Sequence, residues 1–356
     1  MDKANIIRHI EDILAADSGL SLKALHAISR VNIDHKLCQL TLNLGYPSEQ
    51  QVIDTLVAEI EKRFDHLYPE ASIQVNVQRQ LPRFSHDKTV MPLPNIQNIL
   101  LVSSGKGGVG KSTISSQLAS ALQILGARVG LLDADIYGPN QPLMLGQDAQ
   151  AKPGNLKAQM HHGIAVMSMG YLVEKDAAVI WRGPMISNAL MQMLTQTPWP
   201  PLDYLIIDLP PGTGDIPLTL AKKVPVTASI VVGTAQNVAA SDVERCIQMW
   251  GKVNLPILGI VENMSSIVCP GCKQDHSLFS GDALSMLAKK HGLATLAKLP
   301  FDPALTHCAD QGTPLVLAKP QHPLSQALMA LAKQVSYRLA CFTREERRMI
   351  ATGSLA

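Results

Sequence analysis

A glycine-rich segment between an apolar run and a helical pattern constrains this chain more than any other feature. Residues 105–113 place Gly, Gly-Lys and Ser-Thr at the spacing of a phosphate loop. A buried-strand pattern over 99–102 precedes them, and a helical pattern over 114–125 follows. Glycines let the main chain fold around phosphates, and the helix N-terminus adds positive potential. A glycine-rich turn without a ligand is the simpler alternative, but motif, strand and helix together favour a nucleotide site.

The motif assigns individual roles within this loop. In phosphate loops the lysine contacts the β- and γ-phosphates, and the hydroxyl residue that follows ligates Mg²⁺. These positions hold Lys111 and Ser112. The residues predicted to bind the nucleotide are Gly105, Lys106, Gly107, Gly108, Val109, Gly110, Lys111, Ser112 and Thr113.

The remaining patterns predict an α/β fold: a mainly parallel sheet with helices on both faces, preceded by a small α+β domain. From residue 96 onward, helix-length segments alternate with short apolar runs at 99–102, 129–132, 164–167, 204–207, 230–232 and 257–261. Residues 1–79 show helical patterns at 4–16 and 52–60 and strand patterns at 37–44 and 73–77. Prolines predict a linker over 80–95. We therefore expect an ATPase domain over 96–340 and a charged tail over 341–356.

Composition narrows the classes of function. Hydrophobic residues make up 46% of the 356 residues, which is enough for a sizeable core. The net charge, 31 − 29 = +2, lacks the global basic field of a dedicated nucleic-acid binder. No apolar stretch approaches the roughly 20 residues that span a bilayer, and the N-terminal segment lacks a signal-peptide core. We expect a cytoplasmic protein that binds neither nucleic acid nor membrane.

Carboxylates follow two of the predicted strands. Asp133 and Asp135 end the run at 129–132, and Asp208 ends the run at 204–207. Ligands of open α/β sheets bind at the carboxyl ends of strands, so we expect these side chains beside the phosphates. Asp208 is expected to act on Mg²⁺ from the strand end. Strand-end capping is the alternative for Asp133 and Asp135, and Asp215 equally fits nucleotide sensing or a helix cap.

Two cysteines stand at metal-knuckle spacing. Cys269 and Cys272 enclose Pro-Gly, which favours a tight turn that brings the thiols together. Thiolates suit iron–sulfur clusters and zinc. Two ligands are too few for an ordinary cluster, but a two-fold dimer supplies four. Two alternatives remain open: the cysteines could bind zinc together with His276, or they could form a disulfide.

Four segments carry a family resemblance, at residues 133–140, 180–185, 210–215 and 262–272. With the phosphate loop, they closely resemble the Mrp/ApbC family of iron–sulfur cluster carrier ATPases, within the MinD/ParA group of deviant phosphate-loop ATPases. The resemblance covers about residues 96–320. Residues 1–79 are similar in size and pattern to the small iron–sulfur-assembly domain that bacterial members carry in front, although the usual Asp-Pro-Glu turn is absent.

The resemblance implies further roles. It places Lys106 across a dimer interface at the partner's nucleotide, Asp135 at the attacking water, Asp133 near Mg²⁺ and Asn263 at the adenine base. It also implies a 4Fe–4S cluster held by Cys269 and Cys272 at a homodimer interface. A solvated loop lysine and a strand-end turn are the simpler interpretations of Lys106 and Asn263.

The predicted function is therefore that of a slow ATPase that uses ATP and Mg²⁺ and carries a 4Fe–4S cluster. Apo iron–sulfur proteins are the expected recipients, and an upstream scaffold is an expected source. Two alternatives remain open. One is a MinD/ParA-like positioning ATPase that binds membrane or DNA, and the other is a zinc-stabilised, nucleotide-dependent scaffold.

Overall fold

The computed structural model describes residues 1–15, 18–81, 92–136, 138–146, 156–171, 183–269, 271–279 and 281–341. The chain divides into a small unit, residues 1–82 with 333–343, and a large unit, residues 83–332 with 344–356. Each unit has its own hydrophobic core. Most of the predicted linker and nearly all of the predicted tail lie outside the described residues. Among the described residues, no helix combines the length and the apolar character that crossing a membrane requires.

Within its N-terminal residues 1–81 the small unit contains a three-stranded sheet and two helices, and the end of α11 (Pro323–Cys341), from residue 333, also belongs to it. Its strands lie in the order β3-β4-β5, with β3 antiparallel and β5 parallel to β4. The core beneath the helices includes Ile6, Ile10, Leu40 and Phe64, each almost fully buried. The elements are α1 (Lys3–Ile10), β1 (Leu14–Ala15), β2 (Leu20–Ser21), β3 (Ile28–Asp34), β4 (Leu37–Asn43), α2 (Gln50–Leu67) and β5 (Ser72–Gln78).

The helix predicted over 4–16 is wrong in its second half. Helix α1 ends at Ile10, and Leu14–Ala15 pair with Leu20–Ser21 as a short antiparallel ladder. The carbonyl of Ile13 accepts a hydrogen bond from the N–H of Leu22 (2.9 Å), so this stretch bonds to another segment instead of continuing the helix.

The large unit contains an eight-stranded sheet in the order β15-β12-β11-β6-β10-β7-β9-β8. All neighbouring pairs are parallel except β8 with β9. The strands are β6 (Ile96–Ser103), β7 (Val129–Asp133), β8 (Gln159–His161), β9 (Ile164–Ser168), β10 (Leu202–Asp208), β11 (Ala228–Gly233), β12 (Ile257–Glu262) and β15 (Thr295–Lys298). A separate hairpin pairs β13 (Ser266–Val268) with β14 (Asp275–Ser277).

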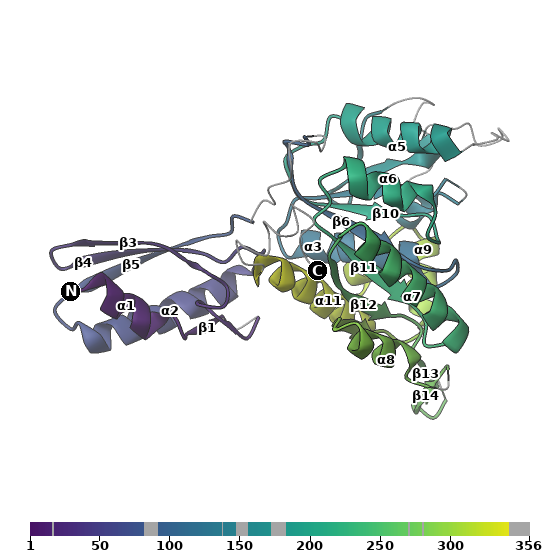
Figure 1. The fold of residues 1–356 in the computed structure, drawn as a ribbon. Coiled ribbons are helices and arrows are strands. Elements are labelled where there is room, and N and C mark those ends of the chain that lie inside the picture. The colour runs from purple at the N-terminus through teal and green to yellow at the C-terminus, as the bar shows by residue number, and fades with distance from the viewer. Residues whose placement is uncertain are drawn as a thin grey trace. The chain divides into compact units, whose positions relative to one another are not determined.

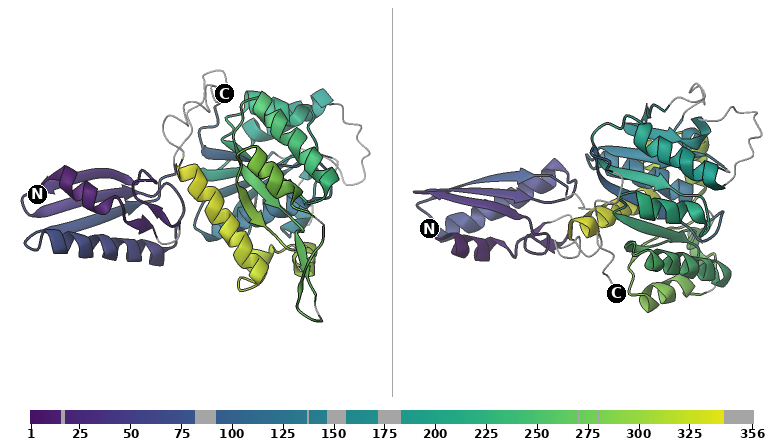
Figure 2. Two further views of the ribbon diagram at one scale, coloured as in Figure 1. Left: turned by 60° about the horizontal axis from the view of Figure 1, so that its bottom comes forward. Right: turned by 45° about the horizontal axis from the view of Figure 1, so that its top comes forward.

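Helices lie against both faces of this sheet (Figures 1 and 2), which confirms the predicted fold class. Helix α3 contacts β6, β7 and β10, whereas α7 and α8 contact β11 and β12. The helices are α3 (Lys111–Ile124), α4 (Gln141–Met144), α5 (Gly183–Gln196), α6 (Asp215–Lys223), α7 (Asn237–Lys252), α8 (Ala283–Lys290), α9 (Pro303–Asp310), α10 (Leu315–Ala318) and α11 (Pro323–Cys341), with a 3₁₀ turn at Met169–Tyr171.

The sheet register fixes the place of the site. Because β10 lies between β6 and β7, Asp208 is paired with Val102 on one side and with Asp133 on the other. The loop that follows β6 therefore emerges beside both carboxylates, at the carboxyl edge where parallel α/β sheets bind their ligands.

Candidate nucleotide and thiol sites

The phosphate loop joins β6 to α3. Gly108 (φ 79°) and Gly110 (φ 83°) have left-handed backbone conformations, and Gly110 is the N-cap of α3. A side chain at Gly110 would also collide with the amide nitrogen of Asn263. Two of the predicted loop glycines are thus required by the backbone itself.

Lys111 and Asp208 form a buried ion pair beneath the loop. The Nζ of Lys111 lies 2.6 Å from Oδ1 of Asp208, and their side chains are 6% and 1% exposed. The hydroxyl of Ser115 donates a second hydrogen bond to the same oxygen at 2.9 Å. The Nζ is also 3.9 Å from Oδ2 of Asp135 and 3.3 Å from Oγ of Ser112. Residues that are distant in sequence thus meet around one ammonium group.

Asp133 is fully buried beside this pair. Its Oδ2 accepts hydrogen bonds from Oγ of Ser168 (3.0 Å) and the N–H of Gln141 (3.2 Å), and its Oδ1 accepts from the N–H of Asp135 (3.2 Å). Burial, and secondarily the charge of Asp208, raises the pKa of Asp133 to about 8. A cation at this point would offset the repulsion between the two carboxylates.

The donor set beside the loop fits a magnesium ion. Ser112, Asp133 and Asp208 offer hydroxyl and carboxylate oxygens, the hard ligands that Mg²⁺ prefers, directly or through water. Magnesium bound here would neutralise phosphate charge during hydrolysis. The chain's own contribution is to bury and orient these oxygens at one sheet edge.

Two other predicted residues are placed differently. Lys106 is exposed, and its main-chain carbonyl accepts a hydrogen bond from Oγ of Ser104 (2.9 Å). Asp215 is also exposed and begins α6, but the N-cap is Gly214 and makes no side-chain capping bond. Asp215 therefore does not have the capping role that the sequence left open.

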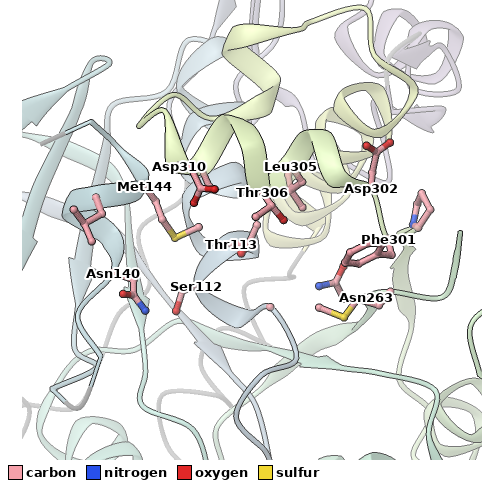
Figure 3. A pocket seen from close by; sticks show the side chains of 15 residues that line it. Ser112, Thr113, Asn140, Met144, Asn263, Phe301, Asp302, Leu305, Thr306 and Asp310 are labelled. Carbon is pink, nitrogen blue, oxygen red and sulfur yellow. The ribbon is translucent and has the colours of Figure 1, made fainter. Parts of the chain in front are cut away.

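A cavity of about 470 Å³ lies next to the loop (Figure 3). Asn263 lines it and donates from Nδ2 to the carbonyl of Val109 at 2.9 Å. This bond leaves Oδ1 of Asn263 as an acceptor for a ligand. Phe301, Asp302 and Thr306 also line the cavity, and no sequence pattern predicted them. Residues 299–303 follow the last strand, β15, at the same sheet edge, and this short strand was not among the predicted ones.

The two cysteines lie at the tip of the β13–β14 hairpin. The N–H of Cys269 donates to the carbonyl of Gln274, and the N–H of Lys273 donates to the carbonyl of Cys269, both at 2.9 Å. Hydrogen bonds from the N–H groups of Cys272 and Gly271, then from the Cys272 thiol, lower the pKa of Cys269. Cys269 is half-buried and Cys272 is exposed, and both are free thiols, not a disulfide. The tip therefore presents two accessible sulfur ligands, and the pKa of one of them, Cys269, is lowered.

Among the described residues, His276 does not belong to a group of three side chains that could hold zinc. His276 lies in β14 opposite Ile267, and within the described ranges no three His, Cys, Asp or Glu side chains gather in a way that could hold a metal ion. Unlike the two hairpin cysteines, the described cysteines Cys38, Cys246 and Cys308 are buried. Burial raises the pKa of Cys246 to about 11, which keeps its thiol protonated.

The hairpin is hydrogen-bonded to the wall of the cavity. The N–H of Phe301 donates to the carbonyl of Ser266 at 2.6 Å, and Phe301 forms a parallel bridge with Ile267. The N–H of Ser265 donates to the carbonyl of Leu299 at 2.9 Å. The strand that leads to Cys269 thus shares main-chain bonds with a residue that lines the cavity.

We expect Gly105→Ala to abolish most nucleotide binding. The Cβ would overlap the main-chain carbonyl of Asp242 in α7, which lies against Gly105 and cannot rotate away as a side chain could. Loop or helix must move, and a displaced loop loses the alignment of its N–H groups toward the phosphates. Equilibrium binding of a fluorescent ATP analogue should weaken by about tenfold or more. Gly251→Ala is the control, because its Cβ meets nothing within 4 Å, and equal affinities for the two variants would contradict the prediction.

This fold and this edge define a P-loop NTPase. A family model described as ParA, NUBPL iron-transfer P-loop NTPase, matches residues 95–336. The chain belongs to this family, as the resemblance predicted. The iron-sulfur cluster carrier protein of Haemophilus influenzae is 48% identical over 251 residues, which are 68% of this chain and 67% of that protein.

Solved structures agree with the fold. A nucleotide-binding protein from Archaeoglobus fulgidus in complex with ADP is 36% identical, with a TM-score of 0.54 over 62% of this chain and 88% of that one. The septum site-determining protein MinD of Pyrococcus horikoshii, complexed with Mg-ADP, is 21% identical, with a TM-score of 0.51 over 67% and 95%. The second likeness bears on the fold alone.

Proposed function

We propose that this protein is an ATP-hydrolysing carrier that holds a 4Fe–4S cluster between two copies of the chain and delivers it to apoproteins. The observation that carries the proposal is the presence, in one P-loop NTPase, of two accessible thiols on a hairpin bonded to the nucleotide cavity. One chain offers two sulfur ligands and a cluster usually takes four, so a two-fold dimer completes the set.

We assign the hydrolytic roles to the residues gathered at the sheet edge. Lys111 leaves Asp208 to contact the β- and γ-phosphates, and Asp135, 3.9 Å from its Nζ, orients the attacking water. Lys106, exposed on the loop, contacts the nucleotide of the other copy. Asn263 binds the adenine base through Oδ1, because the exocyclic amino group of adenine is a donor.

The magnesium ligands and the coupling complete the proposal. Ser112, Asp133 and Asp208 hold Mg²⁺, directly or through water, and the loop from Asp208 to Asp215 responds to the γ-phosphate. Movement of the two copies on hydrolysis changes the separation of their cysteine pairs, which weakens the hold on the cluster. The recipients are apo iron–sulfur proteins, and an upstream scaffold supplies the cluster.

Anaerobic reconstitution tests the carrier function. Protein purified under argon and supplied with iron and sulfide should acquire visible absorption and about four irons per two chains. Light scattering should show a dimer, and an apo 4Fe–4S protein added later should gain the absorption that the carrier loses. A colourless protein that contains zinc without iron or sulfide would support the scaffold alternative and contradict the proposal, as would a single chain under every nucleotide condition.

A further inference from the structure

Gln141 is a fully buried polar side chain beside Ser112, Asp133 and Asp208, and no sequence motif assigned it a role. It is the first residue of α4, and its exposed fraction is 0%. A glutamine carries two donor hydrogens and one carbonyl acceptor, and burying them without partners costs free energy. The hydrogen-bond partners of Gln141 therefore indicate the role of this side chain.

The amide nitrogen of Gln141 bridges two elements of the nucleotide site. Nε2 donates to the main-chain carbonyl of Ser112 at 2.8 Å and to Oδ2 of Asp208 at 2.9 Å. The main-chain N–H of the same residue donates to Oδ2 of Asp133 at 3.2 Å. Gln141 thus donates hydrogen bonds to both buried carboxylates and to Ser112, whose hydroxyl is a predicted magnesium ligand.

The amide orientation follows from these partners. Both neighbours of Nε2 are acceptors, so the nitrogen must occupy that position and Oε1 must point away from it. Oε1 is buried and has no hydrogen-bond partner among the residues that the structure describes. A buried acceptor without a partner, in a residue whose two nitrogens donate to both carboxylates, suits a donor that arrives with the ligand, and water bound to a cation is such a donor.

We propose that Gln141 is a positioning residue for magnesium: Nε2 fixes Asp208 against the loop, and Oε1 accepts a hydrogen bond from a water molecule bound to the cation. The inference rests on the ATP- and magnesium-binding part of the proposed function. Groups that orient metal ligands in this way influence metal affinity strongly although they do not touch the metal.

The chain offers a matched control in Gln117, on α3. Gln117 is 1% exposed, and its Oε1 accepts a hydrogen bond from the N–H of Val316 at 3.2 Å. It is a buried glutamine of the same unit, but this hydrogen bond joins it to α10 and not to a carboxylate. Substitution of either glutamine removes buried hydrogen bonds, so a general loss of stability should affect both variants.

The test compares Gln141→Met with Gln117→Met. Binding of a fluorescent ATP analogue is measured against increasing Mg²⁺, and separately in EDTA. Gln141→Met should raise the half-saturating Mg²⁺ concentration by about tenfold, the lower end of the range for groups that orient metal ligands. Its affinity for the analogue in EDTA should change by less than the magnesium dependence does, and Gln117→Met should keep the wild-type magnesium dependence.

Gln141→Asn provides a second variant if Gln141→Met does not fold. It retains the polar group but is one methylene shorter, so it cannot reach Ser112 and Asp208 together, and the shift should have the same direction. An unchanged magnesium dependence in the folded variant, an equal shift in Gln117→Met, or magnesium-independent binding by the wild type would overturn the inference. The assay contains no iron or sulfide, so failure of the carrier function would leave its result unaffected.

Discussion

Lys111→Met will reduce ATP hydrolysis by about 100-fold or more, because the site loses the ammonium group that offsets phosphate charge. The substitution also leaves the buried Asp208 carboxylate without the cation that lies 2.6 Å away in the wild type. Removing one partner of a buried pair costs about 3–5 kcal/mol of stability. Phosphate release and thermal unfolding should both be measured.

A double variant separates these two effects. Lys111→Met with Asp208→Asn removes both charges, so it should recover much of the lost stability without recovering hydrolysis. Lys298→Met is the control, since Lys298 belongs to the same sheet edge as the last residue of β15 and lies 3.5 Å from the buried carboxylate Glu262. Lys298→Met should hydrolyse ATP at the wild-type rate. Wild-type hydrolysis by Lys111→Met would remove Lys111 from the mechanism.

Replacing both Cys269 and Cys272 with alanine will reduce the iron and sulfide retained after anaerobic reconstitution by about tenfold or more, since thiolates are the cluster ligands. Both thiols lie at the hairpin tip, with Cys272 exposed, so the fold should tolerate the change. ATP hydrolysis without cluster should continue, because the phosphate loop is untouched. Visible absorption and chemical analysis of iron and sulfide give the measurement.

The control for this variant removes two other thiols. Cys38 and Cys308 are 0% and 1% exposed, and Cys38→Ala with Cys308→Ala should leave the cluster content unchanged. Equal cluster content in the two double variants would show that the hairpin does not hold the cluster. Loss in both would point to a general effect of thiol removal.

Local patterns in the sequence predicted the phosphate loop and six of the eight strands of the large sheet, but not the two outermost strands, β8 and β15. The strands around Asp133 and Asp208 are buried on both faces, so each is a short apolar run, and such runs between helices predict a parallel sheet. The sheet register then brings the strand-end aspartates together without further information.

The small unit shows why other elements were missed. Strand β3 contains a register shift between Ile28 and Arg30, which breaks the alternation by which a half-buried strand is recognised. The false extension of the first helix has a different cause: Ile13 has helical spacing, but its carbonyl bonds to Leu22. The hydrophobic periodicities of strands (2) and helices (3.6) do not reveal a register shift or a hydrogen bond to another segment.

Gln141 was missed because its meaning depends on distant residues. Its side-chain partners Ser112 and Asp208 lie 29 and 67 positions away in the sequence. A glutamine before a proline has no distinctive pattern of its own. Only the folded sheet shows that this residue, through its side-chain amide and its main-chain N–H, joins the carboxyl ends of two strands to the phosphate loop.

The hydrogen bond between Phe301 and Ser266 connects the hairpin that carries the two cysteines directly to the wall of the cavity. Phe301 lines the cavity, and from Ser266, whose carbonyl accepts the Phe301 N–H, the strand continues through three peptide units to Cys269. A displacement at the cavity wall would therefore tilt the sulfur-bearing tip without disturbing the central sheet. In that arrangement, a base bound in the cavity would change the position of the two thiols through the hairpin.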